Sequence, residues 1–269
     1  MPLRRVTIAV LGAGTMGQAL IRGLLAAGVP RRNLRAAETH AGTRRRVAAQ
    51  YRITVTADAR EAVRGAHVVM LAVKPQQMAD ALAGVASALS RSQLVISIAA
   101  GLTLRWLERR LSGQPVIRVM PNLPTTVGYG FAAMAAGWRA TATHRRTARA
   151  ILAAVGEVVE LPERQLDAIT AVSGSGPAYV FFLVEAWEQA ARRLGLAPHI
   201  ARAAVRQTLC GSLAVLDTEP VQPGELVQRV ASKRGTTEAA LKVLARRRVA
   251  AHFREALRAA ARRSRELSR

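Results

Sequence analysis

The sequence predicts an α/β protein with a doubly wound parallel sheet, followed by an all-helical region. Short apolar runs alternate with helical patterns up to about residue 162, as expected for a parallel sheet covered by helices. A glycine-rich turn follows the first apolar run. After Pro162 the strand patterns stop and only helical patterns remain. We therefore expect two domains, residues 1–162 and residues 163–269.

The glycine turn, Gly12 to Gly17, lies between the apolar run Val6–Leu11 and a helical pattern. In this context the string G-x-G-x-x-G predicts a dinucleotide-binding turn of Rossmann type. Gly12 permits the tight turn, Gly14 lets a pyrophosphate approach the backbone, and Gly17 lets the helix pack closely. The helix N-terminus presents free N–H groups to the phosphates. The residues expected to hold the pyrophosphate are Gly12, Ala13, Gly14, Thr15, Met16 and Gly17.

Further strands are expected at apolar, β-branched runs. These runs are residues 33–37, 53–55, 68–73, 94–98, 116–120, 130–137 and 158–161. The crossover helices of a parallel sheet are expected between them. Their patterns cover residues 43–51, 60–63, a stretch ending near residue 89, 104–111 and 143–155. In the second domain, helices are expected over residues 167–172, 176–194, 200–216, 223–230, 237–245 and 249–266.

Two opposing signals bear on the choice of cofactor. Glu38 falls about 20 residues beyond the glycine turn, where an acidic residue accepts a hydrogen bond from the adenine ribose. Thr39, His40 and the cluster Arg44–Arg46 lie beside it and could bind a 2′-phosphate instead. The choice between NADH and NADPH therefore stays open, with NADPH slightly favoured.

Composition limits the possible partners. The chain has 269 residues and a net charge of +23, from 40 Lys and Arg against 17 Asp and Glu. Its arginines are scattered in pairs and triples, which is typical of a solvated basic surface and not of a specific nucleic-acid site. The five histidines are isolated, so no metal site is expected.

The cysteine content and the apolar runs of the sequence bear on compartment and membrane topology. Cys210 is the only cysteine, so no intrachain disulfide can form, and we expect a buried structural thiol in a reducing compartment. The sequence shows no signal-peptide pattern, and no apolar run is long enough to predict a transmembrane helix. We expect a cytoplasmic protein that does not bind membranes.

A second loop with a suggestive composition is Ser232–Thr237. It combines hydroxyl groups, a glycine and successive backbone N–H groups just before a helix. This arrangement suits a carboxylate, although ordinary N-capping by Ser or Thr would use the same residue types. A further loop of unusual composition, Ser173-Gly-Ser-Gly-Pro-Ala-Tyr179, lies between predicted helices.

Taken in order, these strings resemble the pyrroline-5-carboxylate reductase family. The most specific are Ser173–Tyr179 and Ser232-x-x-Gly-Thr-Thr237. The resemblance runs from about Thr7 to Leu267. Its other strings are Gly12–Gly17, Ala72–Pro75, Ser97–Gly101, Met120–Pro124, Gln207-Thr208 with Gly211, and Arg263–Leu267.

The resemblance implies an NAD(P)H-dependent reductase that converts 1-pyrroline-5-carboxylate to L-proline. It implies a homodimer built through the helical domain, which in this family often assembles into a decamer. It places Ala72, Val73, Lys74, Pro75, Ala99, Ala100, Gly101 and Asn122 near the nicotinamide and its ribose. It assigns substrate binding to Ser175, Ser232, Gly235, Thr236 and Thr237, with Thr237 as the catalytic residue near the ring nitrogen.

Four residues depart from the family pattern. Lys233-Arg234 replaces the usual Pro-Gly or a similar turn pair, Leu123 replaces a threonine, and Ala59 replaces an asparagine that reaches the adenosine ribose. These departures leave the class of enzyme intact and bear on activity and cofactor choice.

Two alternatives stay open at this point. One is a dehydrogenase of the β-hydroxyacid type, which would need a catalytic lysine in the helical domain. Lys233 and Lys242 are the only lysines after Pro162, and neither has suitable neighbours. The other is a degenerate NAD(P)-binding regulatory protein, or a nucleic-acid-binding protein, suggested by the altered loop and the net charge of +23.

Overall fold

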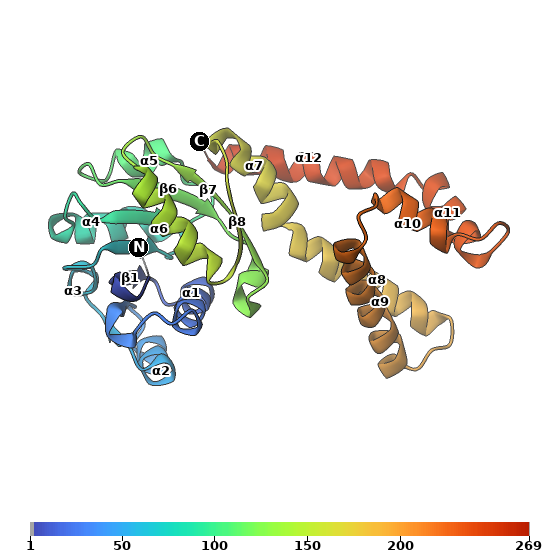
Figure 1. Ribbon diagram of the computed structural model, residues 1–269, viewed down its shortest axis with the longest axis horizontal. Coiled ribbons are helices and arrows are strands. Elements are labelled where there is room, and N and C mark those ends of the chain that lie inside the picture. The colour runs from blue at the N-terminus through green and yellow to red at the C-terminus, as the bar shows by residue number, and fades with distance from the viewer. Residues whose placement is uncertain (1–2, 269) are drawn as a thin grey trace. The chain divides into compact units, whose positions relative to one another are not determined.

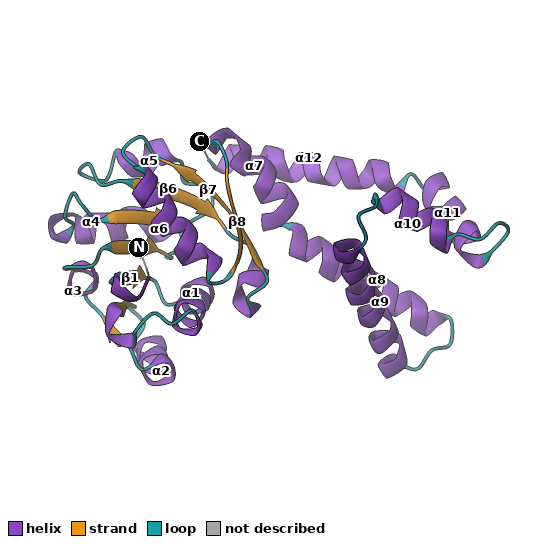
Figure 2. Ribbon diagram, in the orientation of Figure 1, coloured by secondary structure: helices purple, strands orange, loops and turns teal. Residues whose placement is uncertain are grey.

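The computed structural model describes residues 3–268. The chain forms two compact units. Unit 1 comprises the chain up to Ser175 together with the segment from Ala260 onward, and unit 2 comprises Gly176–Ala259. All strands belong to unit 1, whereas unit 2 is entirely helical in the described part of the chain (Figures 1 and 2).

The core of unit 1 is one eight-stranded sheet, in the order β3-β2-β1-β4-β5-β6-β7-β8. The first six strands are parallel and follow the order of a Rossmann domain, which confirms the expected fold class. The strands are β1 (Ile8–Leu11), β2 (Leu34–Ala37), β3 (Thr54–Thr56), β4 (Val68–Leu71), β5 (Leu94–Ser97), β6 (Val116–Met120), β7 (Gly130–Ala136) and β8 (Gly156–Glu160).

The sheet is not parallel throughout, because β7 runs antiparallel to β6. The nine residues between these strands hold only a short 3₁₀ segment, η5 (Leu123–Val127). A parallel connection needs a longer crossover, usually a helix. The helix α6 (Ala142–Ala153) provides such a crossover, and β8 accordingly pairs parallel to β7.

Both faces of the sheet are buried. In β1, Ile8 and Val10 pack into one apolar cluster, whereas Ala9 and Leu11 pack into another. The first cluster is completed by α1 (Thr15–Ala26), α2 (Ala41–Tyr51) and α6. The second is completed by α3 (Ala59–Val63), α4 (Met78–Val85), α5 (Leu104–Glu108) and α7 (Leu166–Ile169). Short 3₁₀ segments are η1 (Leu3–Arg5), η2 (Arg31–Asn33), η3 (Pro75–Gln77), η4 (Ala86–Ala88) and η6 (Glu163–Gln165).

The last part of unit 1 is tied to the sheet by polar contacts. Arg118 of β6 is nearly buried and donates to Glu163 Oε1 at 2.8 Å. The same oxygen accepts the N–H of Leu104 at the start of α5, at 2.7 Å. Asp167 of α7 accepts a hydrogen bond from Ser264 at 2.6 Å. The C-terminal residues from 260 to 268 are therefore part of the same body as the sheet.

Unit 2 consists of helices whose limits lie within about two residues of the predicted ones. They are α8 (Gly176–Arg193), α9 (Pro198–Thr218), α10 (Pro223–Val230), α11 (Thr236–Arg246) and the first part of α12 (Val249–Leu267). Glu188 and Arg206 link α8 and α9 at 3.3 Å. Tyr179 and Phe253 stack edge to face, with ring centroids 6.0 Å apart.

Unit 2 buries little of its apolar surface within one chain. Large side chains of α8, among them Phe181, Phe182 and Trp187, are exposed. Cys210 on α9 is exposed too, so the expectation of a buried thiol is wrong for the single chain. An apolar surface of this extent marks a site of association.

One continuous helical stretch, Glu163–Arg193, is long and apolar enough to cross a membrane by length and composition alone. The sequence expectation did not single it out. Only 6% of its most apolar window is buried within the chain. One such helix is weak evidence for a membrane span, because a helix that packs against a second chain has the same composition.

Candidate cofactor and substrate sites

The glycine turn holds three segments of backbone in close contact. The N–H of Gly12 donates to Ala37 O at 2.9 Å, and the N–H of Ala72 donates to Leu11 O at 2.8 Å. Gly12 has φ +96°, and a Cβ there would lie 2.8 Å from Ala72 O. A side chain at Gly17 would overlap the carbonyl oxygen of Gly12. Both positions therefore require glycine in this backbone.

Gly14 has a different role in the same turn. A Cβ at Gly14 would meet nothing within 4 Å, and its backbone is extended with φ −70°. It is the N-cap residue of α1, and no side chain caps this helix end. Open space beside free helix N–H groups is what an approaching pyrophosphate needs. The geometry therefore fits a dinucleotide.

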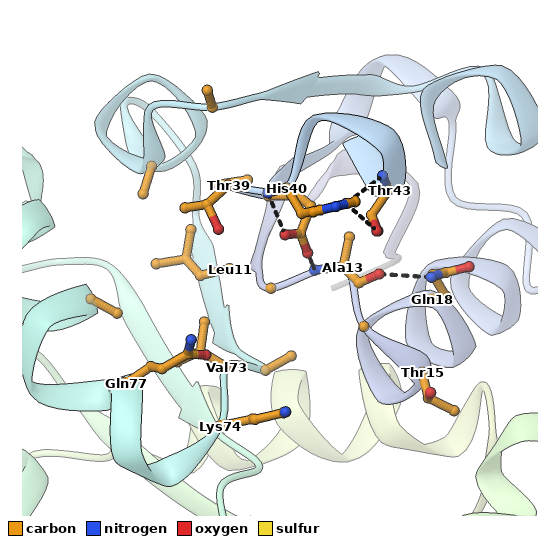
Figure 3. A pocket seen from close by; sticks show the side chains of 18 of the residues that line it. Leu11, Ala13, Thr15, Gln18, Thr39, His40, Thr43, Val73, Lys74 and Gln77 are labelled. Atoms are coloured by element: carbon orange, nitrogen blue, oxygen red, sulfur yellow. Dashed lines mark hydrogen bonds between the residues drawn. The ribbon is translucent and has the colours of Figure 1, made fainter. Parts of the chain in front are cut away.

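A pocket of about 600 Å³ opens beside this turn, at the carboxyl ends of β1, β2 and β4 (Figure 3). This is the point where the strand order reverses, and ligands of open α/β sheets bind there. Nine residues predicted to bind the cofactor line the pocket: Gly12, Ala13, Gly14, Thr15, Glu38, Thr39, Ala72, Val73 and Lys74. Several other residues line the pocket although no sequence motif predicts them there, among them Gln18, Thr43, Ala57, Gln77 and Ala81.

The Glu38 carboxylate contacts the glycine turn from the residue that follows β2. Its Oε2 accepts the N–H of Ala13 at 3.1 Å, and its Oε1 accepts the N–H of His40 at 2.9 Å. Each oxygen retains a lone pair, so the carboxylate can still accept a ribose hydroxyl. Glu38 thus fixes the turn and lines the pocket at once.

The three arginines of α2 differ in their surroundings. Arg44 donates to the carbonyl oxygens of Glu38 and Thr39, at 3.0 and 3.1 Å. Arg46 lines the pocket, whereas Arg44 and Arg45 do not. Arg46 is therefore the cation placed to meet a 2′-phosphate. His40 and Thr43 line the same pocket. Ala59, where the family usually has asparagine, lines the pocket without a polar group.

The remaining predicted cofactor residues of unit 1 lie outside this pocket. Gly101 has φ +78°, and a Cβ there would lie 3.0 Å from the carbonyl oxygen of Leu267. Asn122 is engaged within the protein, with Ser173 and Phe131. The set outside the pocket lining is Met16, Gly17, Pro75, Ala99, Ala100, Gly101 and Asn122.

The predicted substrate loop, Ser232–Thr237, lies in unit 2. Ser175, also predicted to bind the substrate, is the last residue of unit 1 before α8. Helix α11 begins at Thr236, and its N-cap Gly235 has no side-chain cap. The Ser232 hydroxyl folds over Gly235, where an added Cβ would overlap it. Thr237 is half-buried in the first turn of the helix. The loop thus offers hydroxyl groups and uncapped N–H groups, which suit a carboxylate.

Arg234 occupies the left-handed region with φ +62°. Its N–H donates to the Glu238 carboxylate, which also pairs with Lys242. The Lys242 ammonium and the Arg234 N–H hold the pKa of Glu238 below its usual value. Glycine or asparagine would adopt this conformation at lower cost than arginine. The departure from the family pattern at residue 234 therefore introduces local backbone strain.

The Rossmann strand order, the glycine turn and its pocket define a dinucleotide-binding protein. The family model for pyrroline-5-carboxylate reductase dimerisation matches residues 163–267. The model for NADP oxidoreductase coenzyme F420-dependent matches residues 7–101. A pyrroline-5-carboxylate reductase from Pseudomonas aeruginosa is 42% identical over 263 residues, covering 97% of this chain and 96% of that protein. The chain belongs to the pyrroline-5-carboxylate reductase family.

Solved structures agree with this assignment. A pyrroline-5-carboxylate reductase from Coxiella burnetii is similar with a TM-score of 0.92 and 33% identity, covering 98% of this chain and 99% of that one. The Plasmodium falciparum pyrroline carboxylate reductase, solved with NADP bound, has a TM-score of 0.88 and 27% identity, with 99% of each chain covered. The match to a dimerisation model also explains the exposed apolar helices of unit 2: the protein is a homo-oligomer.

The two glycines of the turn should respond differently to alanine. Gly14→Ala should leave the melting temperature unchanged and weaken NAD(P)H binding by about tenfold or more, because the new methyl group fills the space for the pyrophosphate. Gly17→Ala should cost about 2–3 kcal/mol of stability, because it collides with backbone. Thermal unfolding and fluorescence titration with NADPH measure both. A destabilised Gly14→Ala protein would contradict the open geometry of this residue.

Replacing Arg234 by glycine should raise stability by about 0.5–1 kcal/mol, because it removes the strain of a left-handed arginine. Lys233→Gly is the matched control and should not stabilise, since no positive φ occurs at residue 233. Thermal unfolding of the two variants measures the difference. Equal melting temperatures would show that Arg234 is unstrained in solution.

Proposed function

We propose that this protein reduces 1-pyrroline-5-carboxylate to L-proline with NAD(P)H, the last step of proline biosynthesis. The observation that carries the proposal is the 42% identity to a pyrroline-5-carboxylate reductase over nearly the whole of both chains. The glycine turn and its pocket support it, since they offer a dinucleotide both open space and helix N–H groups.

The residues of unit 1 bind and orient the cofactor in this proposal. The turn Gly12–Gly17 holds the pyrophosphate, and Glu38 or Arg46 meets the adenine ribose. Residues 72–75 and 99–101 flank the nicotinamide and its ribose. The bound dihydronicotinamide supplies a hydride for the C=N carbon of the substrate. The protein's own task is to hold the reacting atoms close together, which is worth roughly 7–11 kcal/mol of the barrier.

The residues of the Ser232–Thr237 loop bind the substrate carboxylate. The N–H groups of Thr236 and Thr237 start a helix that has no side-chain cap, so they are available to an anion. A protonated cyclic imine is already a good electrophile, so the reaction needs no protein nucleophile. A threonine hydroxyl is too weak an acid to titrate near pH 7. We therefore assign Thr237 a hydrogen bond to the ring nitrogen, which orients the ring.

The β-hydroxyacid dehydrogenase alternative lacks its catalytic lysine. Lys242 is paired with Glu238, and Lys233 is exposed next to the strained Arg234. We propose that the working form is a homodimer in the cytoplasm, assembled through the apolar helices of unit 2, and that dimers associate further into a decamer. We propose no nucleic-acid or membrane partner.

The direct test is reduction of pyrroline-5-carboxylate, followed by the absorbance of NADH or NADPH. Thr237→Val should lower kcat/KM for the substrate by about 10- to 100-fold, the loss expected for one hydrogen bond of about 1.5–3 kcal/mol to a charged group. Thr54→Val, at an exposed residue of β3, is the matched control and should be fully active. An inactive wild-type protein with both cofactors would refute the proposed function.

The cofactor preference should depend on two opposing residues of the pocket. Glu38→Gln removes a negative charge beside the ribose and should raise kcat/KM for NADPH relative to NADH by about tenfold, which takes only about 1.4 kcal/mol. Arg46→Ala should change the ratio in the opposite direction. Steady-state kinetics with both cofactors measure the ratio. An unchanged ratio in both variants would place the ribose elsewhere.

A further inference from the structure

Asn122 follows β6 at the edge of the sheet where ligands bind. Its side-chain amide is used at both ends within unit 1. Nδ2 donates to Ser173 Oγ at 3.1 Å, and Oδ1 accepts the N–H of Phe131 at 2.9 Å. The amide therefore connects the end of β6, the start of β7 and the segment after α7. No cofactor is needed to explain its orientation.

The segment that Asn122 holds is a single π-helical turn, Thr170–Gly174. The N–H of Ser175 donates to Thr170 O at 2.8 Å, five residues back. A Cβ at Gly174 would lie 2.5 Å from Met120 Cε, so the turn lies directly against the last residue of β6. π-Turns are rare, and they occur frequently at functional sites. An unusual backbone is thus fixed beside the cofactor edge of the sheet.

The π-turn also marks a boundary in the chain. Unit 1 ends at Ser175, and α8 of unit 2 begins at Gly176. Ser175, to which the family resemblance assigns substrate binding, directly follows the π-turn, and its N–H closes the turn on Thr170 O. A displacement of about 1 Å in a reacting group can cost about 10²-fold in rate. The geometry of the π-turn therefore matters for turnover.

We propose that Asn122 is a positioning residue, which acts by holding Ser173 and thereby fixing the π-turn from which α8 starts. The inference rests on the proposed reductase function for its kinetic consequence. It differs from a role in cofactor binding, which the family resemblance suggests for Asn122. Under a positioning role, loss of the Asn122–Ser173 hydrogen bond reduces turnover and leaves cofactor affinity unchanged.

The test uses the full-length protein and three variants. Ser173→Ala, Asn122→Ala and the double variant should each keep the NADPH dissociation constant within about twofold of wild type, measured by fluorescence titration. Each should lower kcat/KM for pyrroline-5-carboxylate by about tenfold, in line with the sensitivity of rate to position. The double variant should be no worse than Asn122→Ala, because that variant has already lost the hydrogen bond to Ser173. Ser87→Ala, at an exposed residue of η4, is the control and should match wild type.

Asn122→Asp provides a rescue, because the Ser173 hydroxyl can turn and donate to a carboxylate while Oδ1 still accepts from Phe131. It should restore activity over Asn122→Ala, and Ser173→Ala should abolish this restoration. If Asn122 instead contacted the cofactor, Asn122→Asp would weaken NADPH binding, because it would place a negative charge beside an anionic ligand. A tenfold rise in the NADPH dissociation constant of Asn122→Ala, or full activity of Ser173→Ala, would overturn the proposal.

A second measurement separates this inference from the proposed function. Hydrogen exchange of the Ser175 amide, followed by mass spectrometry of peptides around residues 170–176, should accelerate in Ser173→Ala and Asn122→Ala. This result does not depend on the substrate. If wild type fails to reduce pyrroline-5-carboxylate but exchange accelerates, the proposed function fails and the fixing role of Asn122 stands. Unchanged exchange in both variants would overturn it.

Discussion

The site depends on how closely the backbone segments approach one another at the carboxyl edge of the sheet. The carbonyl oxygen of Ala72 lies where a side chain of Gly12 would be, and the carbonyl of Gly12 lies where a side chain of Gly17 would be. This contact joins the ends of β1 and β4 to the start of α1. Because it leaves no room for side chains, helix N–H groups and strand ends face the same small volume. The cofactor pocket is a consequence of this packing.

The sequence predicted the features that depend on local pattern. The strand β6 begins and ends at the predicted residues, and α10 does too. The glycine turn and the acidic residue after β2 were found because their spacing reflects a fixed backbone geometry. The Glu38 carboxylate does contact this turn, through the N–H of Ala13. The local sequence pattern was therefore sufficient to locate the glycine turn and the acidic residue that contacts it.

Features that depend on distant partners were not predictable. The buried Arg118 is paired with Glu163, 45 residues away, and nothing in the strand pattern of β6 indicates that partner. The antiparallel pairing of β7 depends on the length of a connection, which hydrophobic periodicity does not report. Cys210 lies in an apolar helix whose apolar surface remains uncovered within one chain, so periodicity alone gave the wrong burial. In each case a long-range contact, or the need for a second chain, decided the outcome.

The return of the chain to unit 1 has a consequence for its architecture. Residues 260–268 lie in the same body as the sheet, with Ser264 bonded to Asp167 and the Leu267 carbonyl against Gly101. Topologically, unit 2 is an insertion with two attachment points and not a tail with one. Both of its ends are covalently restrained by the dinucleotide-binding body. Cleavage of a peptide bond near residue 259 would remove one of these two covalent restraints and leave the sheet intact.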